Sequence, residues 1–589
     1  MKKSFKIFSI AAATAMALTT SGCQDFLTIY PTDKVVLEDF WKDKSDVEGM
    51  VANSYKNLVS DAFIKRVLVY GELRSDDVIE TSSIGTDLKY INNANLLATN
   101  SWCDWSIYYK IINNCNIVLH YAPEVVKEDP DFTNGDLQVV EGEMLAMRAL
   151  CHFYLVRAFR DVPLLKDAMI DDSQPLYRPQ ATPLEAIDFI LSDLAEAENK
   201  VLASGAYNKE TYNKGRFTAD AVRAIRADVL LWKAAFTQFQ SKSDGSDCAG
   251  IYTECINYCE RILADRKQYL IDYKKKHQNG VEDEAIGSLN PLVASYPLET
   301  NPVTQGLGAF HDEPYYQIFG LQNNLKESIL ELQCDQNNNY NYAFSAFYGY
   351  NATQTNMPFT AATFLGKTGE DANLYKSTDL RRVSYTSQYG TEEDVFPITK
   401  YTTEYTNQGT TQKAGTPSYR TSNTDEDNTH YTWSNVILYR ITDVMLMEAE
   451  ARALRHDSIA NDLEEAFKLV KAVYYRSNVY KVPRNDSISY TKGNPESMET
   501  LVMEERQREL CFEGKRWFDL VRMALRDGST QEMLNLMVPH KYETNQSAIK
   551  SKMASIDALF FPIHENVIKV DSALQQNKVY VTEDIYQKN

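Results

Sequence analysis

Apolar residues recur at alternating steps of four and three between Leu137 and Phe159, which places them on one face of a helix. Pro163 follows shortly and ends the pattern, because proline cannot continue a helix. This stretch is therefore predicted to be helical. Similar patterns predict further helices from Pro183 to Lys200, Thr218 to Phe239, Tyr252 to Arg266, Val444 to Arg455, Asp462 to Arg476 and Met498 to Leu525.

Four of these helices are predicted to pair as hairpins of tetratricopeptide type. One hairpin begins near Thr218 and Tyr252, and the other near Thr442 and Asp462. The repeat consensus is not matched, so the prediction rests on the pattern of apolar positions. Small residues permit close helix approach in both hairpins: Ala221, Ala224 and Ala227 in the first, and Ala449, Ala451 and Ala453 in the second.

The pattern changes from about Gln278 to Tyr431, where Asn, Thr, Tyr, Gly and Ser dominate. Amphipathic runs are few there, and short pieces such as Ser328 to Gln333 are typical of strands. Long irregular segments are commonly functional loops on a rigid scaffold, and packed connecting structure is the alternative for any single residue. The predicted fold is mostly α, with a tetratricopeptide-like hairpin scaffold, an irregular loop-rich half and a few short strands.

The N-terminus has the layout of a secretory signal peptide. Basic Met1-Lys2-Lys3 precedes an apolar stretch from Phe5 to Leu18, which is too short to be a permanent membrane span. The following Thr20-Ser21-Gly22-Cys23 resembles the bacterial lipobox, although threonine stands where leucine is usual. An ordinary secreted protein with a chance Gly-Cys is the alternative. We predict a signal peptide over residues 1–22 and acylation of Cys23, which would tether the chain through several acyl groups.

The charge and the aromatic content limit the class of partner. A formal net charge of −20 argues against nucleic acid or an anionic membrane surface, since an acidic field repels both. A neutral ligand is not repelled. The 37 Tyr, 24 Phe and 6 Trp suit surfaces that meet sugars or proteins, although many of these rings must fill a core.

Motifs for the common catalytic and metal sites are missing from the sequence. It has no Gly-x-Ser-x-Gly elbow, no His-Glu-x-x-His helix, no phosphate-binding Gly-x-x-x-x-Gly-Lys and no EF-hand loop, and its 8 histidines are scattered singly. Neither a metal nor a cofactor is predicted. Cys115, Cys151 and Cys511 fit core positions, and the spacing of Cys248, Cys255 and Cys259 matches no common zinc site.

Stretches along nearly the whole chain resemble the SusD/RagB family in the expected order. They are Asp25–Leu27 with Pro31–Asp33, Trp105–Asn116, Glu141–Pro163, Tyr439–Ala451, Glu505–Arg522, Phe561–Ile563 and Gln575–Asn577. The family usually has glycine where Arg160 stands here, which affects a helix cap and not a site.

The resemblance implies a function and a division of the chain. It implies a lipoprotein on the outer face of an outer membrane that binds a nutrient ligand and acts beside a SusC-like TonB-dependent transporter. Residues 1–22 are then the signal peptide, 23–277 an N-terminal helical region, and 278–589 a C-terminal SusD/RagB region with its loop-rich ligand-binding segment at 278–431. The favoured ligand is an oligosaccharide or polysaccharide. A peptide or amino-acid ligand, as in RagB-like members, and a surface glycosidase are the alternatives.

The segment Glu505–Arg522 is predicted to be structural. Opposite charges at helical steps of three and four, from Glu509 and Glu513 to Arg516, Asp519 and Arg522, would form a network that fixes helix packing. Gly514 in a helix interior costs about 1 kcal/mol relative to alanine, which indicates that another backbone packs closely there.

Ligand-binding residues are sought where aromatic rings and hydrogen-bonding groups occur together, because a pyranose needs both. Two segments meet this condition: Arg74–Asp77 through Asn100–Trp102, and Tyr340–Asn351. The resemblance implies ligand loops in both regions. Trp105 belongs to a structural motif and is predicted to be core. The predicted ligand-binding residues are Asp77, Asn100, Trp102, Tyr342, Tyr348 and Tyr350.

Overall fold

The structure is a computed structural model in which part of the chain is described. The described residues are 40–170, 174, 177–277, 291–299, 314–315, 318–319, 326–334, 341–348, 358–366, 374–376, 379–386, 395–401, 403–404, 418–419, 434–455, 459–478 and 488–581. Cys23, the predicted signal peptide and Tyr350 lie outside these residues.

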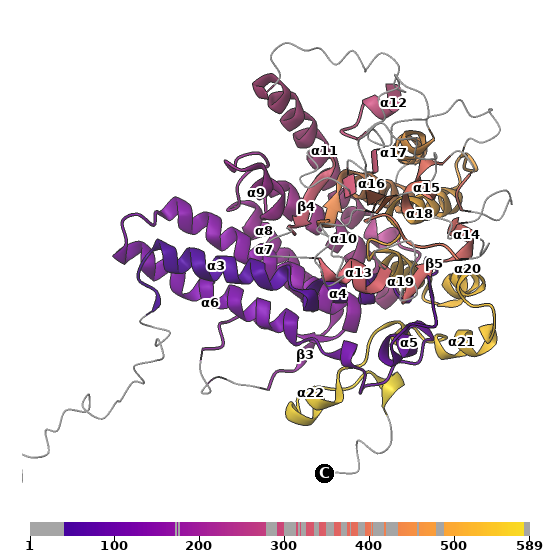
Figure 1. Ribbon diagram of the computed structural model, residues 1–589, viewed down its shortest axis with the longest axis horizontal. Helices are drawn as coiled ribbons and strands as arrows, with labels where there is room; N and C mark the ends of the chain where they lie inside the picture. Colours follow the sequence, from indigo (N-terminus) through magenta and orange to yellow (C-terminus); the bar gives the residue numbers. More distant parts are fainter. Residues whose placement is uncertain are drawn as a thin grey trace, which may run out of the picture.

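The N-terminal part is a layer of long helices around α7 (Asn134–Phe159) (Figure 1). A capping box between Thr133 and Asp136 begins α7, and from Gly142 to Phe159 nearly every residue on all sides is buried. The helix predicted here is confirmed, but α7 is buried on all sides and not only on the one apolar face that the pattern predicted. The helices around it are α3 (Lys44–Leu58), α4 (Asp61–Gly71), α6 (Ser106–Glu128) and α8 (Pro183–Glu198).

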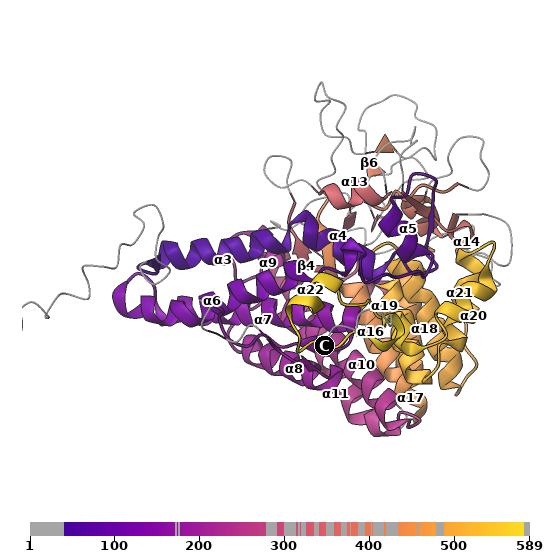
Figure 2. The same cartoon turned by 90° about the horizontal axis from the view of Figure 1, so that it is seen from below.

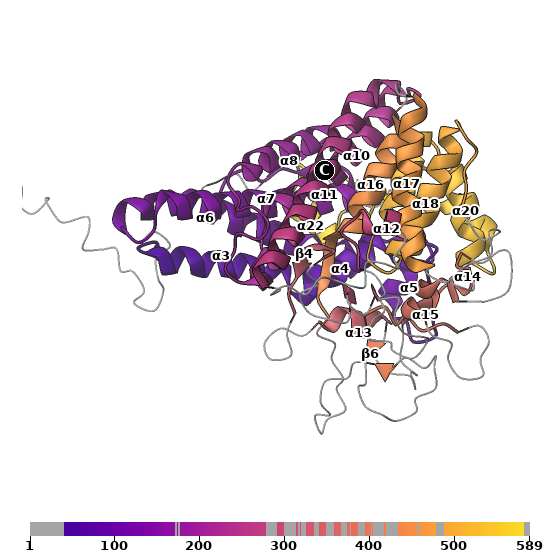
Figure 3. The same ribbon diagram turned by 90° about the horizontal axis from the view of Figure 1, so that it is seen from above.

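Both predicted hairpins are confirmed. Helix α10 (Ala219–Ser241) packs against α11 (Ala249–His277), and α16 (Ile441–Leu454) packs against α17 (Ile459–Ser477). Helix α11 also contacts α16, so the two hairpins stack on each other (Figure 3). All six small residues are buried, as the predicted close helix approach requires: Ala221, Ala224, Ala227, Ala449, Ala451 and Ala453.

The predicted helix from Met498 to Leu525 is wrong at its centre. The chain forms two helices, α18 (Pro495–Leu510) and α19 (Arg516–Asp527). Gly514 lies in the turn between them with φ +72°, and not in a helix interior. The close backbone approach predicted for it is confirmed, because a Cβ placed on Gly71 of α4 would lie 1.8 Å from the carbonyl oxygen of Gly514.

The described strands are short and form four separate antiparallel pairs. The strand predicted at Ser328 to Gln333 is confirmed as β4, which pairs with β8 through an irregular register. The mostly helical fold predicted from the sequence is therefore confirmed. The pairs are β1 (Val78–Glu80) with β5 (Phe359–Ala361), β2 (Val162–Pro163) with β3 (Gln180–Ala181), β4 (Ser328–Leu332) with β8 (Val436–Arg440), and β6 (Thr403–Glu404) with β7 (Ser418–Tyr419).

Short elements of the middle of the chain cover one side of the molecule, next to α4 and α5 (Figures 2 and 3). Helix α13 (Tyr342–Tyr348) contacts α4 and β5 there, so the irregular half packs against the helical scaffold as predicted. The other short elements are α5 (Thr86–Asn92), η2 (Ser101–Cys103), α9 (Glu210–Gly215), η3 (Ser246–Cys248), α12 (Pro291–Ala294), α14 (Thr363–Gly366), α15 (Leu380–Tyr385), α20 (Gln531–Lys541), α21 (Gln546–Lys552), η8 (Ile556–Leu559), α22 (Glu565–Val570) and η9 (Lys578–Tyr580).

One hydrophobic core runs through both parts of the molecule. Trp105 and Cys115, Cys151 and Cys511 are buried in it, as predicted. Among the described residues no cysteine is paired, and none of the Cys, His, Asp and Glu side chains form a group of three or more that would suit a metal ion. Within the same residues, no helix combines the length and apolarity that crossing a membrane requires.

Candidate functional site

Trp102, one of the predicted rings, is partly exposed on the side where α13 lies. Its ring centroid lies 6.0 Å from that of Phe347 on α13 and 5.5 Å from the guanidinium carbon of Arg66. Arg66 is held by the carbonyl of Asp104, to which its Nε donates at 2.8 Å. The Arg66 guanidinium also lies 3.8 Å from the Asp104 carboxylate, which is 42% exposed. An aromatic ring, a guanidinium and a partly exposed carboxylate therefore lie close together.

The backbone around Trp102 is fixed by buried neighbours. The hydroxyl of Tyr70 on α4 donates to the carbonyl of Trp102 at 2.7 Å. Asn100 caps the short helix η2 by accepting from the N–H of Trp102 at 3.0 Å, and its own amide donates to the carbonyl of Asp87 at 2.9 Å. Asn100 is buried and uses both ends of its side chain in these bonds. Asn100 therefore fixes the backbone position of Trp102.

Tyr342 begins helix α13 and is 39% exposed, so it presents much of its ring to solvent. Asn341, immediately before it, accepts from the N–H of Ala343 at 3.2 Å and donates to the carbonyl of Ser434 at 2.9 Å, which fixes the start of the helix. We call Arg66, Trp102 and Asp104 the Trp102 patch, and Tyr342 is a further exposed ring on α13, the helix that also carries Phe347.

Two other predicted ligand-binding residues, Tyr348 and Asp77, are buried. Tyr348 is 1% exposed, and its ring lies near those of Phe344 and Phe512. Asp77 is fully buried and accepts from Gln507 at 2.7 Å. Burial and the neighbouring Asp76 carboxylate raise the pKa of Asp77 to about 6. Neither side chain offers a surface to a ligand in this conformation, and Tyr350 lies outside the described residues.

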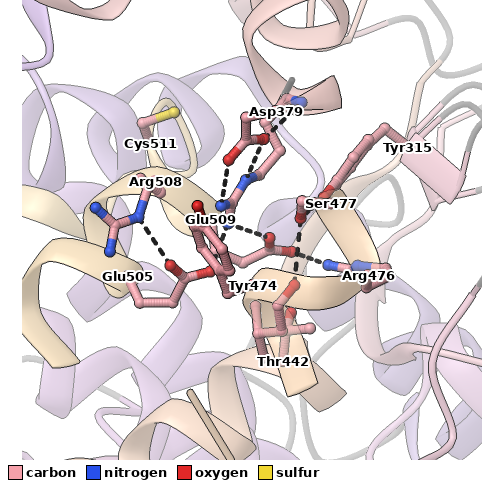
Figure 4. Close-up of polar contacts among 12 residues, drawn as sticks. Tyr315, Asp379, Thr442, Tyr474, Arg476, Ser477, Glu505, Arg508, Glu509 and Cys511 are labelled. Carbon is pink, nitrogen blue, oxygen red and sulfur yellow. Dashed lines mark hydrogen bonds and ion pairs between the residues drawn. The ribbon is translucent and has the colours of Figure 1, made fainter. Parts of the chain in front are cut away.

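A second concentration of polar groups is an ion-pair network around Glu509 (Figure 4). The carboxylate of Glu509 pairs with Arg381 at 3.1 Å and Arg440 at 2.7 Å, and also with Arg476. All four side chains are fully buried. Burial opposes ionisation of Glu509, but the three guanidinium groups hold the pKa of this carboxyl well below its usual range.

The network lies too deep to reach a ligand, and its connections explain its structural role. Arg381 comes from α15, Arg440 from the end of β8, Arg476 from α17 and Glu509 from α18, so one cluster joins four elements. The interpretation of the Glu505–Arg522 segment as a structural charge network is confirmed by this burial and pairing.

The partners within that network differ in part from the predicted ones. Arg522 pairs with Asp519 at 2.9 Å, as the three-residue step predicted. Arg516 pairs instead with Asp76 at 2.9 Å, and Glu513 with Lys400 and Arg440 at 2.7 Å. The break between α18 and α19 removes the helical spacing between Glu513 and Arg516. Arg516 and Asp519 keep their three-residue step within α19, but Arg516 pairs with Asp76 and Asp519 with Arg506 at 2.8 Å, so long-range partners replace the local pair.

Sequence reasoning missed Arg66, which lies on α4, a helix that the apolar pattern did not predict, and outside both chosen segments. No local sequence signal identifies Arg66, because it lies 36 positions before Trp102 in the chain and the two meet only in the folded structure. Phe347 lay inside the segment Tyr340–Asn351, but aromatic residues there alternate too closely to tell exposed rings from buried ones.

Two protein-family models match this chain. A model of the SusD family matches residues 326–580, and a model described as starch-binding, associating with outer membrane, matches residues 35–231. The chain belongs to the SusD/RagB family. The two matches together cover both the helical layer and the ion-pair network, so the SusD/RagB resemblance seen in the sequence is confirmed.

Individual relatives support the same SusD assignment along the chain. Two SusD-like proteins of Formosa agariphila are 25% and 22% identical, over 88% and 89% of this chain and 92% and 91% of their own lengths. A solved SusD homolog from Bacteroides thetaiotaomicron shares the fold with a TM-score of 0.65 at 16% identity, covering 92% of this chain and 98% of that chain.

Arg160 marks a departure from the SusD pattern that the structure explains. It ends helix α7 with φ +70°, a backbone conformation in which glycine is favoured. Its guanidinium pairs with Asp161 at 2.5 Å and also with Asp557. These ion pairs offset the strain of a non-glycine residue at the cap.

Proposed function

We propose that this SusD-family chain binds a glycan at the Trp102 patch and delivers it to a SusC-like TonB-dependent transporter. The observation that carries the proposal is the meeting of the partly exposed Trp102 ring with Arg66 and Asp104 at the side of the ligand-loop helix α13. The starch-binding description of the family model that matches residues 35–231 supports a glycan as the ligand class.

The chemistry of the patch suits a sugar. The apolar side of a pyranose ring packs on an aromatic face, and its hydroxyls need donors and acceptors at the rim of that face. Tyr342 supplies a second exposed ring with a hydroxyl. The Asp104 carboxylate is 42% exposed and supplies acceptors, and Arg66 supplies donors. Asn100, Asp77 and Tyr348 serve in this proposal as the buried support of the patch.

The proposed role is capture without turnover. Glu505, Glu509 and Glu513, the carboxylates of the most recognisable motif, are buried and paired with Arg or Lys. A glycosidase needs two carboxyl groups flanking a bound sugar, so these three groups are not placed for that chemistry.

The proposed location is the outer face of the outer membrane, with Cys23 acylated after removal of residues 1–22. The description of the same family model as associating with outer membrane supports this location. The transporter is proposed from the family resemblance, since SusD-like lipoproteins act beside such barrels. Co-purification of the transporter with the full-length lipoprotein from membranes tests this part separately from ligand binding.

A microarray that carries glycans and peptides, probed with residues 24–589, tests the ligand class. The proposal predicts retention on a subset of glycan spots with none on peptides, and product analysis of a bound glycan should find it intact. Retention on peptides alone would replace the glycan by the peptide alternative. Cleavage with turnover would overturn capture as the function.

A further inference from the structure

The turn between α18 and α19 has an unusual backbone. Phe512 has φ +68°, a left-handed conformation that is strained for a bulky side chain, and Gly514 has φ +72°. The turn is also confined from outside, since a Cβ on Gly514 would lie 2.8 Å from the carbonyl oxygen of Val67 on α4. Such a conformation persists only where surrounding contacts determine it.

Glu72, which directly follows α4, supplies these contacts on the N–H side of the turn. One of its carboxyl oxygens accepts from the N–H of Phe512 at 2.8 Å, and the other accepts from the N–H of Gly514 at 2.9 Å. Glu72 is fully buried. A single side chain thus holds both backbone donors of the turn in one orientation, as in an anion-binding nest.

The carbonyl side of the turn carries the loop-rich part of the chain. The carbonyl of Phe512 accepts from the hydroxyls of Tyr348 at 3.4 Å and Tyr401 at 3.3 Å. Tyr348 is the last residue of α13, and Phe344, one turn earlier, stacks on Tyr401 with ring centroids 3.7 Å apart. Helix α13 is therefore hydrogen-bonded, through Tyr348, to a carbonyl whose orientation depends on the backbone conformation of Phe512.

We propose that Glu72 is a positioning residue, which holds the Phe512 turn so that α13 lies against Trp102. The inference rests on the proposed function in treating α13 as the helix that carries ligand contacts. Glu72 is fully buried and contacts no ligand itself. It acts through Phe512 and Tyr348, and its loss should loosen α13 while the helical scaffold stays folded.

Glu72 and Asp77 are buried carboxyl groups with raised pKa values, so the pH dependence of α13 protection is a second quantity to measure. Burial and the Asp77 carboxylate raise the pKa of Glu72 well above its usual value, and Asp77 is itself raised to about 6. The charged or titratable groups that face this pair are Asp76 on the same loop, Tyr348 on α13, Tyr401, Cys511 on the turn, Arg516 on α19 and Lys541 on α20.

Raised carboxyl pKa values stabilise the folded form at low pH, because the folded site then holds protons that the unfolded chain has released. For Asp77 this contribution is present below its ordinary value of 3.8 and is lost as pH rises through about 6. Protection of α13 should therefore fall over this range in the wild type. Asp77→Asn should remove this pH dependence of α13 protection, because it removes the titrating group. The hydrogen bonds from the N–H groups of Phe512 and Gly514 to Glu72 are kept in this variant.

Hydrogen exchange with mass spectrometry on the ligand-free protein tests the inference. Glu72→Gln should reduce the protection factor of peptides spanning 341–348 about ten- to a hundredfold, because one turn N–H loses its acceptor in a buried site. Tyr348→Phe should reduce it about fivefold through loss of one neutral hydrogen bond. Tyr385→Phe is the matched control, since it removes a buried hydroxyl that donates to the carbonyl of Glu509 at 3.2 Å, near the turn but not on α13.

The outcomes separate positioning from general stability. Local loss over 341–348 with unchanged protection in α10 and α11, and the pH slope abolished in Asp77→Asn, would support the proposal. Unchanged α13 in Tyr348→Phe, or an equal loss across α10 and α11 in Glu72→Gln, would overturn it. Should Glu72→Gln fail to fold, Tyr348→Phe decides alone. No ligand is present, so these results are independent of whether the Trp102 patch binds a glycan.

Discussion

Arg516 and Asp76 are 440 positions apart in the chain, yet the Nε of Arg516 donates to the Oδ1 of Asp76 at 2.9 Å with both side chains buried. This pair joins the start of α19 to the loop after α4. It links the N-terminal helical layer to the C-terminal motif, so the two halves share one packed core.

Arg516→Ala should therefore destabilise the protein strongly. Removing one partner leaves the Asp76 carboxylate buried without its guanidinium, which costs about 3–5 kcal/mol. Thermal and urea unfolding measure the loss. Arg261→Ala is a matched control, because Arg261 is 58% exposed and pairs at the surface with Glu198, where about 1 kcal/mol or less is at stake. Equal stability of the two variants would contradict the role given to the buried pair.

Acid should weaken the protein through the network of α18 and α19. Burial raises the pKa of Asp519, but the Arg506 and Arg522 guanidinium groups outweigh it and lower the value from 3.8 to about 2. A lowered carboxyl pKa gives stability that is present above the unfolded value and is lost as pH falls through the folded one. Urea midpoints measured from about pH 5 down to about pH 2 should fall over this window. Asp519→Asn should be less stable at neutral pH and show a shallower decline, and a decline as steep as the wild type's would exclude Asp519 as a contributor.

The strain at Arg160 can be measured by comparing two substitutions. Both Arg160→Gly and Arg160→Ala remove the ion pairs with Asp161 and Asp557, but only glycine adopts φ +70° without a Cβ penalty. Arg160→Gly should be more stable than Arg160→Ala by about 1 kcal/mol in thermal or urea unfolding. Identical stabilities would show that the cap is relaxed.

The lipid anchor is tested by metabolic labelling with palmitate. The wild type should incorporate the label and fractionate with outer membranes, whereas Cys23→Ala should do neither. Cys248→Ala is the control, since it removes another cysteine and leaves the Thr20–Cys23 signal intact. A Cys23→Ala protein that remained equally membrane-bound would contradict the anchor.

Periodicity predicted α7, α10 and α16 from apolar residues that recur at helical steps, but it did not predict α3, α4 or α6. It failed at Cys511–Lys515, where the helical pattern continues but the chain turns. Glu72 and Gly71 determine that turn, and they lie more than four hundred positions away in the sequence. The pattern of apolar residues within one segment cannot predict a contact with a segment so far away in the chain.

In the candidate site, the sequence could not predict which aromatic side chains are exposed and which are buried. Tyr342 and Tyr348 belong to one aromatic-rich segment, yet one is 39% and the other 1% exposed. Their positions on α13 decide this difference, and the boundaries of a seven-residue helix are not evident from a sequence rich in Tyr, Asn and Ala. Trp102 could be chosen from its polar neighbours, while its contact with Arg66 required the fold.

Isothermal titration with a glycan retained on the array measures how much Trp102 and Tyr342 contribute to glycan binding. Loss of a stacking ring should cost about 1–3 kcal/mol, so Trp102→Ala and Tyr342→Ala should each weaken binding by roughly one to two factors of ten while the melting temperature stays near the wild-type value. Tyr177→Ala, which removes a ring that is 57% exposed outside the patch, should bind like the wild type. Wild-type affinity in folded Trp102→Ala and Tyr342→Ala proteins would contradict glycan capture at this surface.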